Sequence, residues 1–106
     1  MGFFDFFKGT DINAGVAEYQ GLSRAMLIDV READEFGGGH IPGARNIPLS
    51  RLNKVTSAIQ DKDMPLYVYC LSGGRSASAA AALKRMGYTD VHNIGGINSY
   101  RGALER

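Results

Sequence analysis

The alternation of apolar strand-like runs with helix-like runs is the feature that most constrains the fold of this 106-residue chain. Buried strands are predicted for three apolar runs, at residues 25–30, 64–70 and 90–96. Helices are predicted for the runs at residues 10–20, 49–60 and 76–87. Because strands that alternate with helices form mostly parallel sheets covered on both faces, we predict an α/β domain.

Local signals suggest where these elements begin and end. Ile12 is expected to end a short extended piece, with Asn13 as the N-cap of the first helix. Ser50 is a plausible cap for the second helix, and the third is expected to start near Ser76. A helical turn from residue 31, a break at residues 37–39, an extended piece at 44–47 and a short helix around Tyr100 complete the prediction.

Composition restricts the functions that a single domain of this size can have. Charged residues make up 22% of the chain and its net charge is +1, so we expect no nucleic-acid partner. The chain has one cysteine, Cys70, which cannot form an internal disulfide, and a cytoplasmic location is therefore expected.

The first nine residues, MGFFDFFKG, are apolar but do not resemble a signal peptide or a membrane span. Asp5 interrupts the apolar run, and no basic region precedes it. We predict that residues 1–9 form a flap on the domain or on a second subunit, and that residues 10–106 form the domain. A monomer or weak homodimer is expected.

Cys70 ends a predicted strand, where ligands bind in open α/β sheets. The glycines Gly73 and Gly74 allow the following backbone to curl, so that its N–H groups turn toward one centre. Arg75 and the start of the next helix add positive charge that would stabilise a thiolate. The pattern predicts a reactive cysteine whose loop holds an anion.

Neither a metal site nor a cofactor site is expected elsewhere in the chain. The spacing of His40, His92 and Cys70 matches no metal motif. Asp29 and Arg31 lie at the end of a strand, and we expect them to stabilise the structure around the site rather than to touch substrate. His40, within a tight crossover, is expected to anchor that loop by hydrogen bonds.

Four motifs in order resemble the rhodanese (thiosulfate sulfurtransferase) domain in its small single-domain form. They are an Asp-Val-Arg strand end, a Gly-His-Ile-Pro-Gly-Ala crossover, the segment YCLSGGRS and the turn NIGGINSY. The resemblance covers the chain from about Ile12 to about Tyr100. The resemblance implies a three-layer fold with a mostly parallel sheet of about five strands.

The resemblance also implies sulfur transfer through a persulfide on Cys70, with small sulfur donors and thiol acceptors or a sulfur-relay protein as partners. It assigns Cys70 as the nucleophile, Arg75 to an anionic donor or to fixing the loop, and the cradle for the outer sulfur to the amides of Leu71, Ser72, Gly73, Gly74, Arg75 and Ser76. The loop contains no lysine, so the donor stays open among thiosulfate, a polysulfide and a protein persulfide.

Two alternatives remain. Related cysteine-based phosphatases and arsenate reductases carry five residues between the cysteine and the arginine, whereas this chain has four, from Leu71 to Gly74. The shorter loop favours a single sulfur atom over a tetrahedral oxyanion. A binding module without catalysis is the other alternative.

The chain differs from the family pattern at Tyr100, where many members have tryptophan, and this change keeps an aromatic side chain.

Overall fold

The computed structural model describes residues 11–106, which form an α/β domain with a four-stranded parallel sheet. Its elements in chain order are α2 (Ile12–Gln20), β1 (Met26–Asp29), α3 (Ala33–Gly38), β2 (Arg45–Asn46), the 3-10 helix η1 (Leu49–Lys54), α4 (Val55–Ala58), β3 (Leu66–Cys70), α5 (Gly74–Arg85), β4 (Val91–Gly96) and the 3-10 helix η2 (Ile97–Ser99). The predicted α/β class is confirmed.

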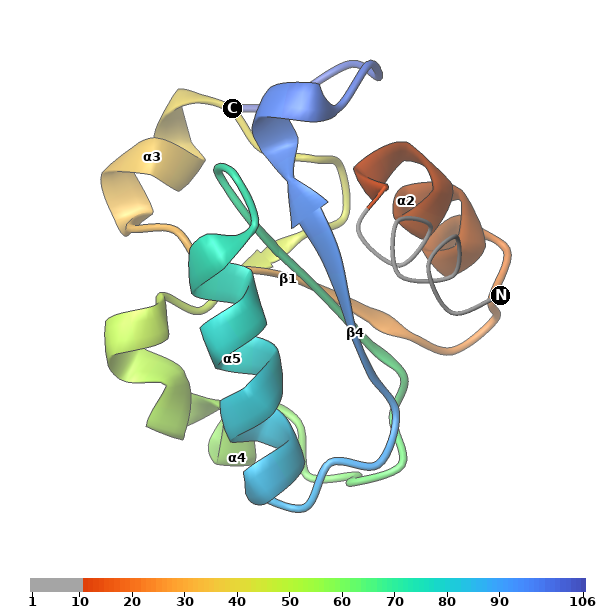
Figure 1. Ribbon diagram of the computed structural model, residues 1–106, viewed down its shortest axis with the longest axis vertical. Helices are drawn as coiled ribbons and strands as arrows, with labels where there is room; N and C mark the ends of the chain where they lie inside the picture. The colour runs from red at the N-terminus through yellow and green to blue at the C-terminus, as the bar shows by residue number, and fades with distance from the viewer. Residues whose placement is uncertain (1–10) are drawn as a thin grey trace.

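The strand order is β2-β1-β3-β4, so β3 lies inside the sheet between β1 and β4. Figure 1 shows α2 on one face of the sheet, and α5 with α4 on the other. Side chains of β3 alternate between the two faces: Val68 and Cys70 pack in the core under α5, whereas Tyr67 and Tyr69 pack in the core under α2. This alternation places Cys70 on the α5 face.

Helix α5 packs closely on the sheet because its inward face is built from small residues. Ala79 and Leu83 are fully buried, and Ala80 is nearly so. The helix starts directly after Gly73, whose φ of 106° lies in the left-handed region that favours glycine. Such a turn lets the chain leave β3 and enter α5 within a few residues.

Two predictions at the start of the domain are wrong. Ile12 does not end an extended piece but opens α2, so the sheet of the described residues has four strands rather than about five. Asp11, not Asn13, caps this helix, because its carboxylate accepts hydrogen bonds from the backbone N–H groups of Asn13 and Ala14. The Asn13 side chain instead bonds the backbone of Ser99 and Arg101.

The other helix boundaries also differ from the sequence prediction. Residues 49–60 form η1 and the short α4 rather than one helix, and Arg51 inside η1 has the non-helical φ of −125°. Pro48 is the N-cap, and Ser50 lies inside η1. Helix α5 starts at Gly74 instead of Ser76, and the short helix η2 ends before Tyr100.

The predicted flap at residues 1–9 lies outside the described residues. From residue 11 onward, no helix combines the length and the apolar character needed to cross a membrane.

Candidate active site

Cys70 is the last residue of β3, at the edge of the sheet where all four parallel strands end. Strand β1 ends at Asp29 and β4 at Gly96 on the two sides of it, and α3 lies near the same edge in Figure 1. The thiol is 1% exposed, because the loop from Leu71 to Gly73 and the first turn of α5 enclose it.

Hydrogen-bond donors converge on the sulfur of Cys70. The backbone N–H of Gly73 donates to Sγ at 3.0 Å, and the Ser76 hydroxyl oxygen lies 3.5 Å from Sγ. Burial raises the pKa of the Cys70 thiol, but the Ser76 side chain and the amides of Ser76, Gly73 and Ser72 favour the thiolate. The net effect lowers this pKa below its ordinary value.

Ser76 is fully buried and links the cysteine to β4. Its Oγ lies 2.7 Å from Asn93 Oδ1 and 3.1 Å from the carbonyl oxygen of Gly73. Asn93 Oδ1 also accepts a hydrogen bond from the Gly95 amide at 3.1 Å. Because the hydroxyl has one proton, it can donate to Asn93, to Gly73 or to Sγ, but not to all three.

The cysteine loop rests against the glycine end of β4. The Asn98 amide donates to the Leu71 carbonyl at 3.1 Å. A Cβ at Gly96 would lie 2.3 Å from that same carbonyl oxygen and 2.6 Å from the Ser72 Cα, so only glycine allows this approach. A cavity of about 420 Å³ adjoins the contact and is lined by Ser72, Gly73, Ala77, Asn93, Gly95, Gly96, Asn98 and Ser99.

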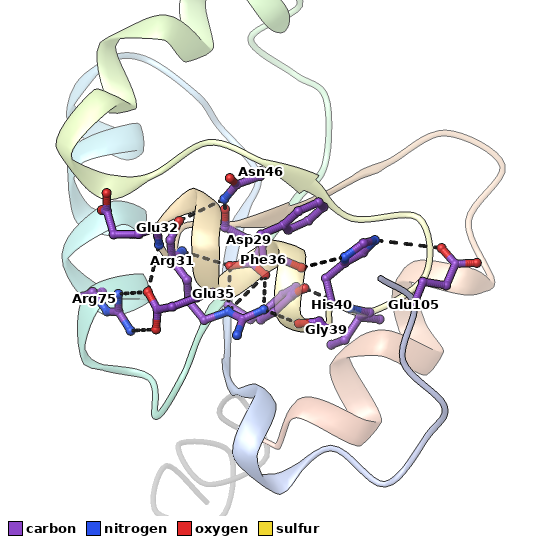
Figure 2. Close-up of polar contacts among 12 residues, drawn as sticks. Asp29, Arg31, Glu32, Glu35, Phe36, Gly39, His40, Asn46, Arg75 and Glu105 are labelled. Atoms are coloured by element: carbon purple, nitrogen blue, oxygen red, sulfur yellow. Dashed lines mark hydrogen bonds and ion pairs between the residues drawn. The ribbon is translucent and has the colours of Figure 1, made fainter.

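Arg75, in the first turn of α5, forms a two-bond ion pair with Glu35 of α3. Its two terminal nitrogens donate to the two carboxylate oxygens at 2.8 and 3.0 Å, as Figure 2 shows. The Arg75 guanidinium, together with a hydrogen bond from the Glu32 amide, lowers the pKa of Glu35 to about 2. Both side chains are about one-third exposed, at 35% and 29%.

Asp29 and Arg31 form a buried ion pair beside this contact (Figure 2). Arg31 donates to both carboxylate oxygens of Asp29 through Nε and Nη2, and Nη2 also donates to the Gly39 carbonyl at 2.7 Å. The Asn46 side chain donates to the backbone carbonyls of Asp29 and Arg31. The pair therefore ties the end of β1 to the crossover after α3.

His40 lies at the far side of the same network. Its ring stacks on Phe36 with centroids 3.8 Å apart, and Nδ1 lies 3.0 Å from the Phe36 carbonyl oxygen. The backbone of His40 also pairs with Glu105 in an antiparallel bridge. These contacts hold the crossover and the C-terminal segment together.

The structure thus brings Ser72, Gly73 and Ser76 to the sulfur, whereas Asp29, Arg31 and His40 form a neighbouring network. The roles predicted for the amides of Leu71, Gly74 and Arg75 stay predictions. Sequence reasoning missed three residues of the site: Glu35, Asn93 and Gly96. Glu35 had a local signal, because it closes a Glu-x-x-Glu capping box with Glu32 at the start of α3. Asn93 and Gly96 lie in the quoted turn motif, but their partners are distant in sequence.

Over residues 11–106, no three His, Cys, Asp or Glu side chains are grouped so that they could hold a metal ion.

A cysteine at the end of an inner parallel strand, followed by a short loop and a helix start, places this chain among α/β domains whose site lies at the carboxyl ends of the strands. The family described as "Rhodanese-like domain" matches residues 14–103. The chain therefore belongs to the rhodanese-like domain family.

Similar proteins of known sequence and structure support this membership. The uncharacterized protein YqhL of Bacillus subtilis is 46% identical over 80% of this chain and 68% of its own length. The thiosulfate sulfurtransferase PspE of Escherichia coli is 41% identical over 66% of this chain and 68% of its own. A solved structure of a rhodanese with anions from E. coli superposes with a TM-score of 0.72 at 35% identity, over 77% of this chain and 98% of that one.

Proposed function

We propose that this domain is a sulfurtransferase that carries sulfane sulfur as a persulfide on Cys70. The observation that carries the proposal is the ring of donors at the sulfur, with the Gly73 amide at 3.0 Å and the Ser76 hydroxyl at 3.5 Å. Preorganised donors of this kind stabilise negative charge, at about 3–4 kcal/mol each where they have been removed by mutation. In the resting thiolate this charge is on Sγ, and in the persulfide it moves to the outer sulfur one bond away, where we expect the amides of the same loop to stabilise it.

The reaction would take two displacements at sulfur. The Cys70 thiolate attacks the outer sulfur of a donor, the donor's sulfur–sulfur bond breaks, and its remaining part leaves with the electron pair. With thiosulfate the products are the Cys70 persulfide anion and sulfite. An acceptor such as cyanide or a thiolate then attacks the outer sulfur, which returns Cys70 to its thiolate.

The enclosure of the thiol supports sulfur as the transferred group. Cys70 is 1% exposed, and four residues separate it from Arg75. A single sulfur atom needs less room in such a loop than a tetrahedral phosphoryl or arsenate group. Arg75 is also engaged by Glu35, so in this state it does not offer an open cradle for an oxyanion.

The mass of the intact protein after incubation with thiosulfate, a polysulfide or a small-molecule persulfide tests the proposal. We expect one added sulfur atom, which cyanide removes as thiocyanate. A Cys70→Ala variant, with the same fold by circular dichroism, should gain none. Sulfur transfer that persists in Cys70→Ala would contradict the assignment of Cys70 as the sulfur carrier.

Assays on the same sample distinguish this function from the alternative functions. Turnover of an aryl phosphate or arsenate without persulfide formation would indicate a phosphatase or a reductase. A Cys70 that alkylates no faster than a free thiol and takes sulfur from no donor would indicate a binding module. The physiological acceptor, and a monomer or weak homodimer in solution, stay predictions.

A further inference from the structure

The arginine next to the sulfur site is occupied by a carboxylate of its own chain. Arg75 is the charged residue of the loop segment, and Glu35 satisfies two of its N–H groups through a bidentate contact between α5 and α3. Such a geometry is among the strongest that an arginine makes, and an incoming anion would have to compete with it.

The second arginine near Glu35 does not compensate for this neutralisation. Arg31 is the second arginine near Glu35, and it is bound to Asp29 in a buried pair. Glu32 also lies close enough to act on Arg75. Glu32 in turn shares a cavity with the cations Arg45, Arg51 and Lys54. Arg31 and Arg75 are therefore each paired with one carboxylate, and neither is left as an unpaired cation.

We propose that Glu35 is a specificity-determining residue that withholds Arg75 from anionic donors, so that Cys70 takes sulfur from donors of low charge, such as thiol persulfides, in preference to thiosulfate. The inference rests on the proposed sulfurtransferase function and names its substrate class. Glu35 acts through Arg75 and is a positioning residue.

Two donors that differ by one charge allow a direct test. Thiosulfate is a dianion, and the Cys70 thiolate would release sulfite from it. Methanethiosulfonate is a monoanion, and the same attack on its outer sulfur releases methanesulfinate. Because both transfer a sulfane sulfur by breaking one sulfur–sulfur bond, their comparison isolates the effect of donor charge, which scales the electrostatic energy.

The variant to compare is Glu35→Gln. Glutamine keeps an oxygen that can accept the Glu32 amide hydrogen bond, which Glu35 Oε1 accepts at 2.8 Å, so the start of α3 should be retained. In single-turnover loading of Cys70, we expect the second-order rate constant for thiosulfate to rise about tenfold, and that for methanethiosulfonate to rise about threefold. The gain should shrink as ionic strength increases.

Two control variants test whether Glu35 affects sulfur loading through Arg75. Asp34→Asn makes the same charge change on the exposed side of α3, where no contact with Arg75 is recorded, and should alter neither rate by as much as twofold. Arg75→Met in the Glu35→Gln background should abolish the thiosulfate gain, since the gain depends on a released guanidinium.

The unaltered protein gives a test that needs no variant. Because Arg31 and Arg75 are both paired, the negative charge of the Cys70 thiolate should repel an incoming anion. Added sodium chloride should then speed thiosulfate loading, and the effect on methanethiosulfonate should be about half as steep on a logarithmic scale. A decrease with salt would mean that the site attracts dianions, and would overturn the proposal.

Equal changes of the two rate constants in Glu35→Gln would also overturn the proposal, since Glu35 would then act only on the structure of the loop. No change in either rate constant would overturn it as well, since Glu35 would then have no effect on sulfur loading. These results leave the proposed function standing. Failure of every donor to load wild-type Cys70 would instead contradict the proposed function itself.

Discussion

Ser76 shows how a single hydroxyl proton can respond to the state of the sulfur. In the structure its Oγ is closer to Asn93 Oδ1, at 2.7 Å, than to Cys70 Sγ, at 3.5 Å. A charged acceptor attracts a donor more strongly than a neutral amide does. We therefore expect the hydroxyl to turn toward Sγ when Cys70 ionises, while Asn93 keeps the hydrogen bond from the Gly95 amide.

Replacing Ser76 with alanine should raise the pKa of Cys70, because a donor that favours the thiolate is lost. The alkylation rate of Cys70 at neutral pH should fall severalfold, and the midpoint of its pH profile should move to higher pH. Ser78→Ala, an exposed position on the same helix, is the matched control. An unchanged profile in Ser76→Ala would show that the hydroxyl does not act on the sulfur.

Among the secondary-structure elements, β4 helps to position the cysteine loop, because the two approach each other closely. The Gly96 position meets the backbone of Leu71 and Ser72, and backbone atoms cannot move aside as the end of a flexible side chain can. The position of the loop, and with it the direction of the Gly73 amide, is therefore set in part by β4.

Gly96→Ala should push this loop away from β4 and misplace the donors around Cys70. We expect sulfur loading to slow by about 100-fold, the size of effect that a displacement near 1 Å can have on a reaction that depends on alignment. Single-turnover loading monitored by intact mass would measure it. Gly37→Ala, where an added Cβ meets nothing within 4 Å, should load at the wild-type rate.

If Gly96→Ala loads normally, the contact between β4 and the loop has no part in aligning the donors.

The elements differed in how far they could be predicted from sequence. Apolar runs located β1, β3 and β4 to within one or two residues, because buried parallel strands leave a continuous hydrophobic signal. The cysteine loop could also be predicted, since Cys70, Gly73 and Gly74 lie within a segment of five residues. Glu35 was not, because it meets Arg75 across 40 positions, and no local pattern specifies that meeting.

The errors at helix starts have a similar cause. Both Asp11 and Asn13 are good N-cap residues, and the choice between them depends on η2. Because Asn13 bonds Ser99 and Arg101, it is used for a tertiary contact and Asp11 takes the cap. Such competition is decided only when distant segments come together.

Across the whole molecule, the buried pair of Asp29 and Arg31 adds polar contacts between segments whose apolar residues lie in the two hydrophobic cores. Asp29 is fully buried at the end of β1, and Arg31 reaches the Gly39 carbonyl beyond α3. The Asn46 side chain joins β2 to the same place. The sheet edge beneath the active-site loop is therefore braced by one connected set of polar contacts.

Asp29→Asn should lower the free energy of unfolding by about 3–5 kcal/mol, because it leaves the Arg31 charge buried without its partner. Urea denaturation followed by circular dichroism would measure this loss. Asp61→Asn removes a carboxylate from the ion pair with Arg24, whose side chains are 42% and 55% exposed, and should cost less than about 1 kcal/mol. Equal stability changes in the two variants would contradict the bracing role.

The inner position of β3 also affects how such a domain can diversify. Cys70, the proposed sulfur carrier, is fixed by a strand with hydrogen-bonded neighbours on both sides, whereas Glu35 stands on a short helix at the rim. Exchanges on α3 can therefore change which donor is preferred while the sulfur stays in place. One scaffold could supply paralogues with different sulfur sources through changes at its periphery alone.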